Sequence, residues 1–179
     1  KRYQRLRASE VILFVAFKKH SEARMIVGDI TVATSRIWAR CAIAFATRNE
    51  DDFELLVRDV TNNLISSPKA LRRVVSLCHR FGKLDAARRY AASSTDAALQ
   101  FQIYALLARY DVDSAEDLRE AERLYRRLST EGVSHSSQCD YGRLQLAHAL
   151  FLRERKDAAL TVAGDIRNPR ILVRAYLRL

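Results

Sequence analysis

Hydrophobic positions recur every three to four residues along most of this chain, in segments separated by short polar breaks. This spacing places the apolar side chains on one face of an α-helix, whereas β-strands would need alternating apolar and polar residues. No convincing run of such alternation occurs. The 179 residues include only five Gly and two Pro, so few positions interrupt a helix. The pattern therefore predicts an all-α protein.

Polar residues with capping character mark several of the expected helix starts. Ser21, Asn49, Asp96 and Ser114 can each cap the helix that follows, and Asn168-Pro169 combines a cap with proline at the first helical position. The periodicity and these caps together predict helices over about residues 3–19, 21–28, 33–48, 50–64, 68–80, 84–92, 96–110, 115–128, 138–155, 157–166 and 170–179.

The stretch Leu77–Leu99 predicts a helical hairpin. A helix ends at a Phe81-Gly82 break and is followed by a short Ala-rich helix containing Ala87. Comparable alanines recur at Ala121 and again at Ala159. The intervals between these three alanines are near the period of helix-pair repeat proteins. We therefore expect consecutive hairpins that pack on one another through small residues.

Three of the expected hairpins carry a shared set of apolar and small residues. The positions are Val74, Val75, Gly82 and Ala87 in one hairpin, Ala121, Tyr125 and Leu128 in the next, and Leu146, Ala147, Ala159, Ala163 and Pro169 in the last. Over about residues 35–175 the chain resembles the tetratricopeptide repeat family on these positions. An earlier hairpin around Ala42 and Phe45 keeps the repeat length but has Glu54 where the family has alanine.

The resemblance implies a right-handed α-solenoid of about four helix-turn-helix repeats with flanking N- and C-terminal helices. It divides the chain into capping helices over residues 1–32 and a repeat domain over residues 33–179. Another α-solenoid or an irregular helical bundle would share much of this pattern and stays open.

The resemblance also implies a binding surface, because the family binds peptides in a concave groove lined by the first helix of each repeat. Most of the matching positions are basic or amide residues, which suit an acidic segment or a terminal carboxylate. The alternative is a solvated helix face without a ligand. The matching residues are Arg36, Lys69, Arg72, Ser76, His79, Arg80, Gln102, Arg109, Tyr141 and His148, with Arg40 as a further candidate.

The formal net charge of +10 is distributed unevenly and leaves several classes of partner open. Residues 1–50 carry a net charge of +6, residues 101–150 a net charge of −2 and the last 29 residues a net charge of +4. A basic protein can bind nucleic acid, anionic lipid or an acidic protein. Residues 23–43 could form a helix-turn-helix bearing Arg36, Trp38 and Arg40, so nucleic-acid binding or transcriptional regulation is the alternative function. Trp38 itself is interpreted as a core residue.

The sequence gives little support for catalysis, a metal or a cofactor. Cys41, Cys78 and Cys139 contain no C-x-x-C pair, which suggests small core residues in a reducing compartment. His135 lies four residues before Cys139, but this pair spans a serine-rich loop and a helix start and is interpreted as a cap region. The acidic turn around Glu116 has no histidine beside it. We expect no enzyme activity, no cofactor and no metal.

The sequence therefore predicts a scaffold or adaptor that binds a protein or an acidic peptide. Its longest unbroken apolar run, Val11–Phe17, has seven residues, far below the roughly 20 that cross a bilayer. We expect membrane association only through a segment beyond these residues, and a cytoplasmic location that includes the cytoplasmic face of an inner membrane. The high arginine content suggests a bacterial source and a larger assembly, such as a secretion or exopolysaccharide-export system.

Overall fold

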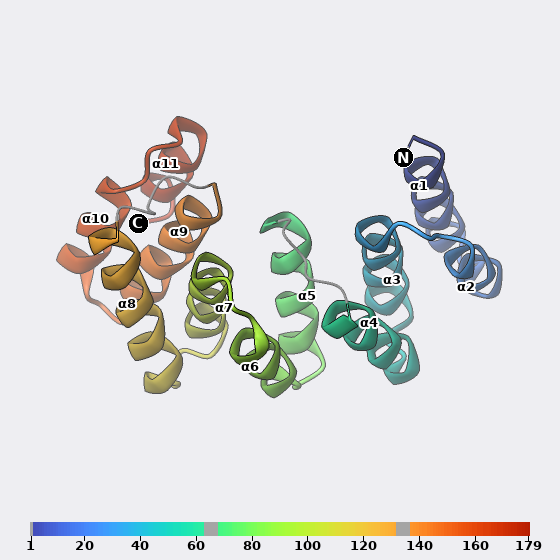
Figure 1. Ribbon diagram of the computed structural model, residues 1–179, viewed down its shortest axis with the longest axis horizontal. Helices are drawn as coiled ribbons and strands as arrows, with labels where there is room; N and C mark the ends of the chain where they lie inside the picture. Colours follow the sequence, from blue (N-terminus) through green and yellow to red (C-terminus); the bar gives the residue numbers. More distant parts are fainter. Residues whose placement is uncertain (1, 63–67, 132–136) are drawn as a thin grey trace. The chain divides into compact units, whose positions relative to one another are not determined.

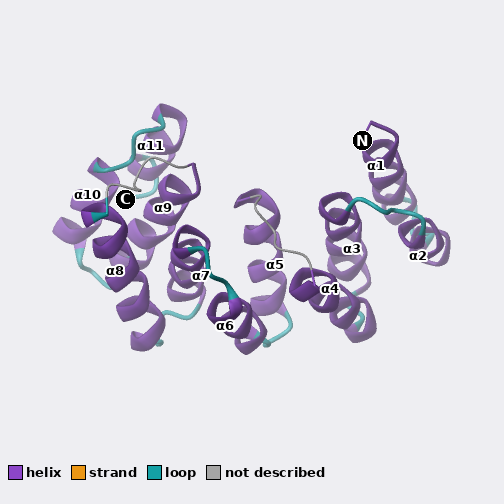
Figure 2. Cartoon of the chain, viewed as in Figure 1, coloured by secondary structure: helices purple, strands orange, loops and turns teal. Residues whose placement is uncertain are grey.

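The computed structural model describes residues 2–62, 68–131 and 137–179, and these residues form helices and turns without a strand (Figure 2). The all-α prediction is confirmed for this part of the chain. In chain order the helices are α1 (Arg2–Ala16), α2 (His20–Gly28), α3 (Ala33–Thr47), α4 (Glu50–Asn62), α5 (Pro68–Arg80), α6 (Leu84–Ser93), α7 (Ala97–Tyr110), α8 (Ala115–Thr130), α9 (Ser137–Phe151), α10 (Lys156–Gly164) and α11 (Pro169–Tyr176), labelled in Figure 1.

Most of the predicted caps satisfy backbone N–H groups in the first turn of their helices. The side-chain oxygens that accept these hydrogen bonds belong to Asn49 (from Asp52), Asp96 (from Ala98 and Leu99), Ser114 (from Asp117) and Asn168 (from Arg170). The predicted cap at Ser21 is wrong. Helix α2 begins one residue earlier, at His20, with Lys19 as its N-cap and without a side-chain cap hydrogen bond.

Three helices end three or four residues earlier than predicted. One is α11, which ends at Tyr176 rather than at Leu179, and the other two end at turns that contain no glycine. Helix α1 ends at Ala16 rather than near Lys19, and α9 ends at Phe151 rather than near Arg155. In these turns Lys18 (φ 59°) and Glu154 (φ 60°) adopt the left-handed backbone region, which is uncommon for residues with a side chain. Gly82 (φ 66°) adopts the same backbone region after α5, and at this turn the glycine in the sequence correctly predicted the end of the helix.

The chain forms two compact units, residues 1–82 and residues 83–179. In the first unit α1 packs against α2 and α3, and α3 packs against α4 and α5. The predicted boundary at residue 32 therefore falls inside this unit. Its buried residues between α1, α2 and α3 include Val11, Val27 and Ile43. An ion pair from Arg24 to the buried Asp52 (2.7 Å) joins α2 to α4.

In the second unit, α7 packs against α6, α8 and α9, and α9 also packs against α10 and α11 (Figure 1). Ala121 and Ala159, two of the small residues that define the predicted period, are fully buried. Gly142 on α9 lies so close to α7 that an added Cβ would be 2.5 Å from the Phe101 ring. Small residues therefore allow the helices of this unit to approach closely.

Candidate ligand-binding surface

The strongest candidate site lies on the first unit, where three helices contribute neighbouring aromatic, apolar and cationic side chains. We call it the α1–α3–α5 surface and define it by Arg5, Ser9, Ile12, Trp38, Phe45, Arg73 and Arg80. Residues 1–82 carry fifteen Lys or Arg against eight Asp or Glu, so this unit holds +7 of the formal charge of +10. All residues of the surface therefore belong to the more basic of the two units.

A groove of about 520 Å³ separates α1 from α3 on this surface. Its lining combines apolar side chains with hydroxyl groups, and Ile12 in its wall is 43% exposed. The lining residues are Arg5, Ala8, Ser9 and Ile12 from α1 and Val32, Thr34, Ser35 and Trp38 at and within the start of α3. Grooves of this size and composition hold an apolar group and orient it with a few polar atoms.

Two arginine–aromatic pairs lie beside the groove, between α3 and α5. The guanidinium carbon of Arg73 is 4.1 Å from the centre of the Trp38 ring, and that of Arg80 is 4.3 Å from the centre of the Phe45 ring. Each cation–π contact at an exposed position stabilises the folded state by about 0.5–1 kcal/mol. Trp38 thus contributes both to the groove and to the first of these pairs.

The spacing of the two pairs follows directly from the helix repeat. Trp38 and Phe45 are seven residues apart on α3, as are Arg73 and Arg80 on α5. Seven residues correspond to two helical turns, so the pairs are about 10.5 Å apart along the helices. A guanidinium stacked on a ring is partly ordered before a ligand arrives, so it loses less conformational freedom on binding a carboxylate or a phosphate.

Several of the predicted groove residues on α5 lie on or near this surface. Arg80 forms the second arginine–aromatic pair, and Ser76 is half-buried between the two arginine positions. Arg72 and His79 are exposed on the same helix. Lys69 lies in the first turn of α5, but its side chain is outside the described residues. Their roles as ligand contacts stay predictions.

Arg36 and Arg40 are oriented toward α4 instead. Both guanidinium groups donate to the Oδ2 atom of Asp59, Arg36 at 3.0 Å, and Arg36 also donates to the Ile30 carbonyl oxygen at 3.0 Å. At 100° per residue, these two arginines lie on roughly the opposite side of the α3 helix axis from Trp38 and Phe45. The two arginines predicted for the groove of the first repeat therefore join α3 to α4.

Two of the four predicted groove residues of the second unit are buried where α7 packs against α9. Gln102 is 1% exposed and His148 is 5% exposed, while Tyr141 is half-buried. Arg109 donates to the Gln145 Oε1 atom at 2.7 Å, across the two helices. Burial, followed by the positive charges of Arg109 and Arg178, lowers the pKa of His148 to about 4. At Gln102 and His148 the expected open groove is instead a buried interface between helices.

Sequence reasoning missed most of the residues that define the α1–α3–α5 surface. Trp38 was assigned to the core, and Arg5, Ile12, Phe45 and Arg73 were not considered as ligand contacts. The available signal was the shared seven-residue spacing of Trp38 and Phe45 and of the two arginines. That signal becomes specific only when α3 and α5 are known to pack together.

The described residues contain no arrangement of three or more His, Cys, Asp or Glu side chains that could hold a metal ion. All three cysteines are buried, and burial raises the pKa values of Cys41 and Cys78 to about 12. Such thiols are protonated at neutral pH and are poor nucleophiles. His135, which the sequence places near Cys139, lies outside the described residues.

Over the residues that the structure describes, no helix combines the length and the apolar character needed to span a bilayer. No family model matches this chain, and neither a similar curated protein nor a similar solved structure was found. The functional interpretation therefore depends on the geometry and charge of the chain itself.

Proposed function

We propose that this chain is a protein-interaction module that binds an acidic segment of a partner protein on the α1–α3–α5 surface. The observation that carries the proposal is the pair of arginine–aromatic contacts, Arg73 on Trp38 and Arg80 on Phe45, beside an apolar groove. The groove binds an apolar side chain of the segment. The two guanidinium groups bind the carboxylates of the segment through charge-assisted hydrogen bonds.

The order of helix packing supports a hairpin-repeat module of the tetratricopeptide type. Consecutive helices pack as α1 with α2, α3 with α4, α7 with α8 and α9 with α10. The first helices of neighbouring hairpins are also in contact within each unit, α1 with α3, α3 with α5, and α7 with α9. Each hairpin of a repeat protein buries its apolar face against its neighbours in this way, and such proteins use the shared face for binding.

Single-stranded nucleic acid is the second candidate ligand, because aromatic and arginine side chains also stack on bases. Two observations favour a protein segment. The rings of Trp38 and Phe45 each already have a guanidinium against one face. Among the described residues that line the adjoining groove, Arg5 is the one cation and the others are apolar or carry hydroxyl groups, whereas a groove that follows a phosphate backbone is strongly basic.

Selection of random 12-residue peptides displayed on phage, with the full chain as the target, tests the proposal. We expect the selected peptides to combine Asp or Glu with a large apolar residue. Replacing both guanidinium groups in the Arg73→Gln, Arg80→Gln variant should raise the Kd of a selected peptide at least tenfold in fluorescence anisotropy, because charge-assisted hydrogen bonds contribute about 1.5–3 kcal/mol each.

The matched control is Arg119→Gln, Arg126→Gln, which removes the same charge from two exposed positions on α8. This control should bind the selected peptide within about twofold of the unmodified chain, apart from a small long-range effect that 0.15 M salt screens. Selected peptides without acidic residues, equal weakening in both double variants, or tighter binding of a single-stranded oligonucleotide that displaces the peptide would each contradict the proposal.

A further inference from the structure

A second surface on the first unit combines exposed apolar side chains with a high positive charge. On α1 and the turn after it, Tyr3, Leu6, Leu13 and Phe17 are 61%, 62%, 59% and 75% exposed. At 100° per residue these four positions fall within an arc of about 80°, on the side of α1 opposite the buried Ala8. We call these four residues the α1 stripe. Glu10 falls within the same arc, so these four residues form an exposed apolar stripe that one carboxylate interrupts. No described element of the first unit covers the stripe.

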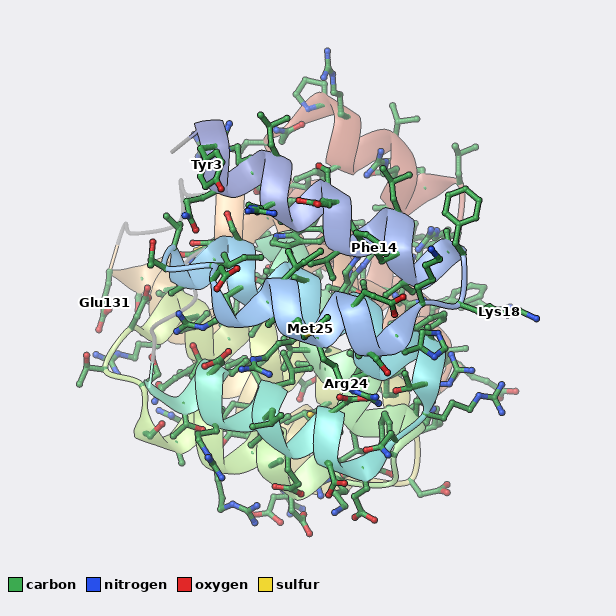
Figure 3. The ribbon with its side chains drawn as sticks, turned by 90° about the vertical axis from the view of Figure 1, so that its right-hand side faces the viewer. Tyr3, Phe14, Lys18, Arg24, Met25 and Glu131 are labelled. Atoms are coloured by element: carbon green, nitrogen blue, oxygen red, sulfur yellow. The ribbon has the colours of Figure 1, made fainter. Side chains whose placement is uncertain are left out.

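The sequence around the α1 stripe is rich in Lys and Arg. Residues 1–28 carry seven Lys or Arg against two Asp or Glu, a net charge of +5 that is half of the total. Lys18 and Lys19 are exposed directly after Phe17, and Arg5 is exposed beside Leu6. Figure 3 looks onto α1 and α2, with Tyr3 near one end of α1 and Lys18 extending from the other.

The one acidic residue on the stripe is paired with a neighbouring arginine. Glu10, the one acidic residue of α1, accepts a hydrogen bond from Arg7 at 2.9 Å. The left-handed backbone at Lys18 closes a tight turn that leaves Phe17 and the two lysines at its tip. The result is a helix whose exposed apolar side chains end in an aromatic residue followed by two cations.

We propose that the α1 stripe docks on the surface of an anionic lipid bilayer, lying in the interface without spanning it. Large apolar side chains enter the boundary between headgroups and acyl chains, and flanking lysines and arginines remain at the headgroups. Each Lys or Arg near such a surface adds a favourable electrostatic contribution. Arg5 belongs to both surfaces, but Phe17, Lys18 and Lys19 are not part of the α1–α3–α5 surface, so variants at these three residues test this inference separately from the proposed peptide site.

Charge argues against a second copy of the chain as the occupant. If two α1 stripes met in an antiparallel arrangement, Arg5 of each copy would approach Lys18 and Lys19 of the other. Two regions of charge +5 would then face each other, and like charges brought together across an interface are strongly unfavourable.

Shape argues for a lipid surface over an acidic protein. The apolar side chains stand along a single helix as a ridge, while the groove that α1 does form lies on its α3 side. A protein partner would need a matching apolar groove with acidic edges, whereas a bilayer adapts to such a ridge and supplies the anionic charge. We therefore assign the stripe to lipid.

Sedimentation of the full chain with extruded vesicles tests this assignment. One set of vesicles contains phosphatidylcholine with phosphatidylglycerol as a substantial minor component, and the other contains phosphatidylcholine alone. The unmodified chain should sediment with the anionic set and much less with the neutral set. Lys18→Gln, Lys19→Gln should lower the partition coefficient about 30-fold, and Phe17→Ser should lower it at least tenfold.

Two controls separate the stripe from general basicity and general apolar exposure. Arg119→Gln, Arg126→Gln removes the same charge from the other unit, and Leu177→Ser removes a side chain that is 79% exposed there. Both should retain the unmodified partition coefficient. As a direct readout of insertion, Phe17→Trp in a Trp38→Phe background should shift its fluorescence to shorter wavelength with anionic vesicles, since Trp38 is the single natural tryptophan.

Absence of sedimentation with anionic vesicles would overturn the assignment, as would equal losses in the stripe variants and their controls. A Phe17→Trp emission that does not shift would overturn it as well. Capture of an acidic protein by the stripe, without vesicle binding, would assign the surface to a protein partner instead.

Discussion

The pH dependence of stability in the second unit should depend strongly on His148. This side chain is 5% exposed on α9, and its Nε2 atom is buried without a hydrogen-bond partner. Charging the ring would bury a cation that lacks compensation, near the positive charges of Arg109 and Arg178. The folded state therefore holds the neutral imidazole, and the pKa of His148 falls from 6.5 to about 4.

The sign and size of the effect follow from linkage. Below pH 6.5 the unfolded state binds a proton at His148, while the folded state does not until pH falls to about 4. Acidification therefore favours the unfolded state over this window, and the stabilising contribution is fully present only above pH 6.5. The difference in pKa corresponds to a loss of roughly 3 kcal/mol across the whole window and about 2 kcal/mol by pH 5.

Urea unfolding of the unmodified chain and of His148→Gln, at pH 7.5 and pH 5, measures the contribution of His148 to the pH dependence of the free energy of unfolding. Because carboxylates also begin to titrate in this range, the informative quantity is the difference between the two proteins. The unmodified chain should lose about 2 kcal/mol more than the variant. Equal losses in the unmodified chain and His148→Gln would refute the reasoning.

Two further substitutions test the packing of the second unit. Gly142→Ala should lower the free energy of unfolding by about 1–3 kcal/mol, since the added methyl group collides with the Phe101 ring, whereas Gly164→Ala has open space and should show no such loss. Arg88→Met should cost about 1–3 kcal/mol, because Arg88 contacts the buried Asp117 carboxylate at 2.6 Å and its loss leaves that charge poorly compensated. Urea unfolding measures both, and an unchanged midpoint with an unchanged slope would contradict either prediction.

The helices were predictable because their signals are local. The spacing of apolar residues predicted every helix of the described chain. Caps such as Asp96 and Asn168 predicted the first residue of several helices to within one residue of its observed position. The turns after α1 and α9 were placed too late because they use Lys18 and Glu154 in the left-handed region. Most side chains disfavour that conformation, so nothing in the residue type indicated that the helix would end.

The α1–α3–α5 surface was only partly predictable because its contacts join distant parts of the chain. Arg80 and Ser76 were predicted from the resemblance as positions on one helix, and both lie on or near this surface. Trp38 was misassigned because a tryptophan among apolar helical residues usually belongs to a core, and its cation, Arg73, lies far along the sequence on another helix. His148 was placed on an open face because periodicity does not show whether a helix face meets solvent or another helix.

The single tryptophan gives the most direct test of the proposed function, because Trp38 lines the groove and also contacts Arg73. In a ¹H–¹⁵N spectrum the indole N–H of Trp38 gives one resolvable signal. Titration with a selected acidic peptide should move this signal in a saturable way in the unmodified chain. The same titration should leave it nearly unmoved in Arg73→Gln, Arg80→Gln. A peptide that binds tightly while the Trp38 signal stays in place would contradict the account.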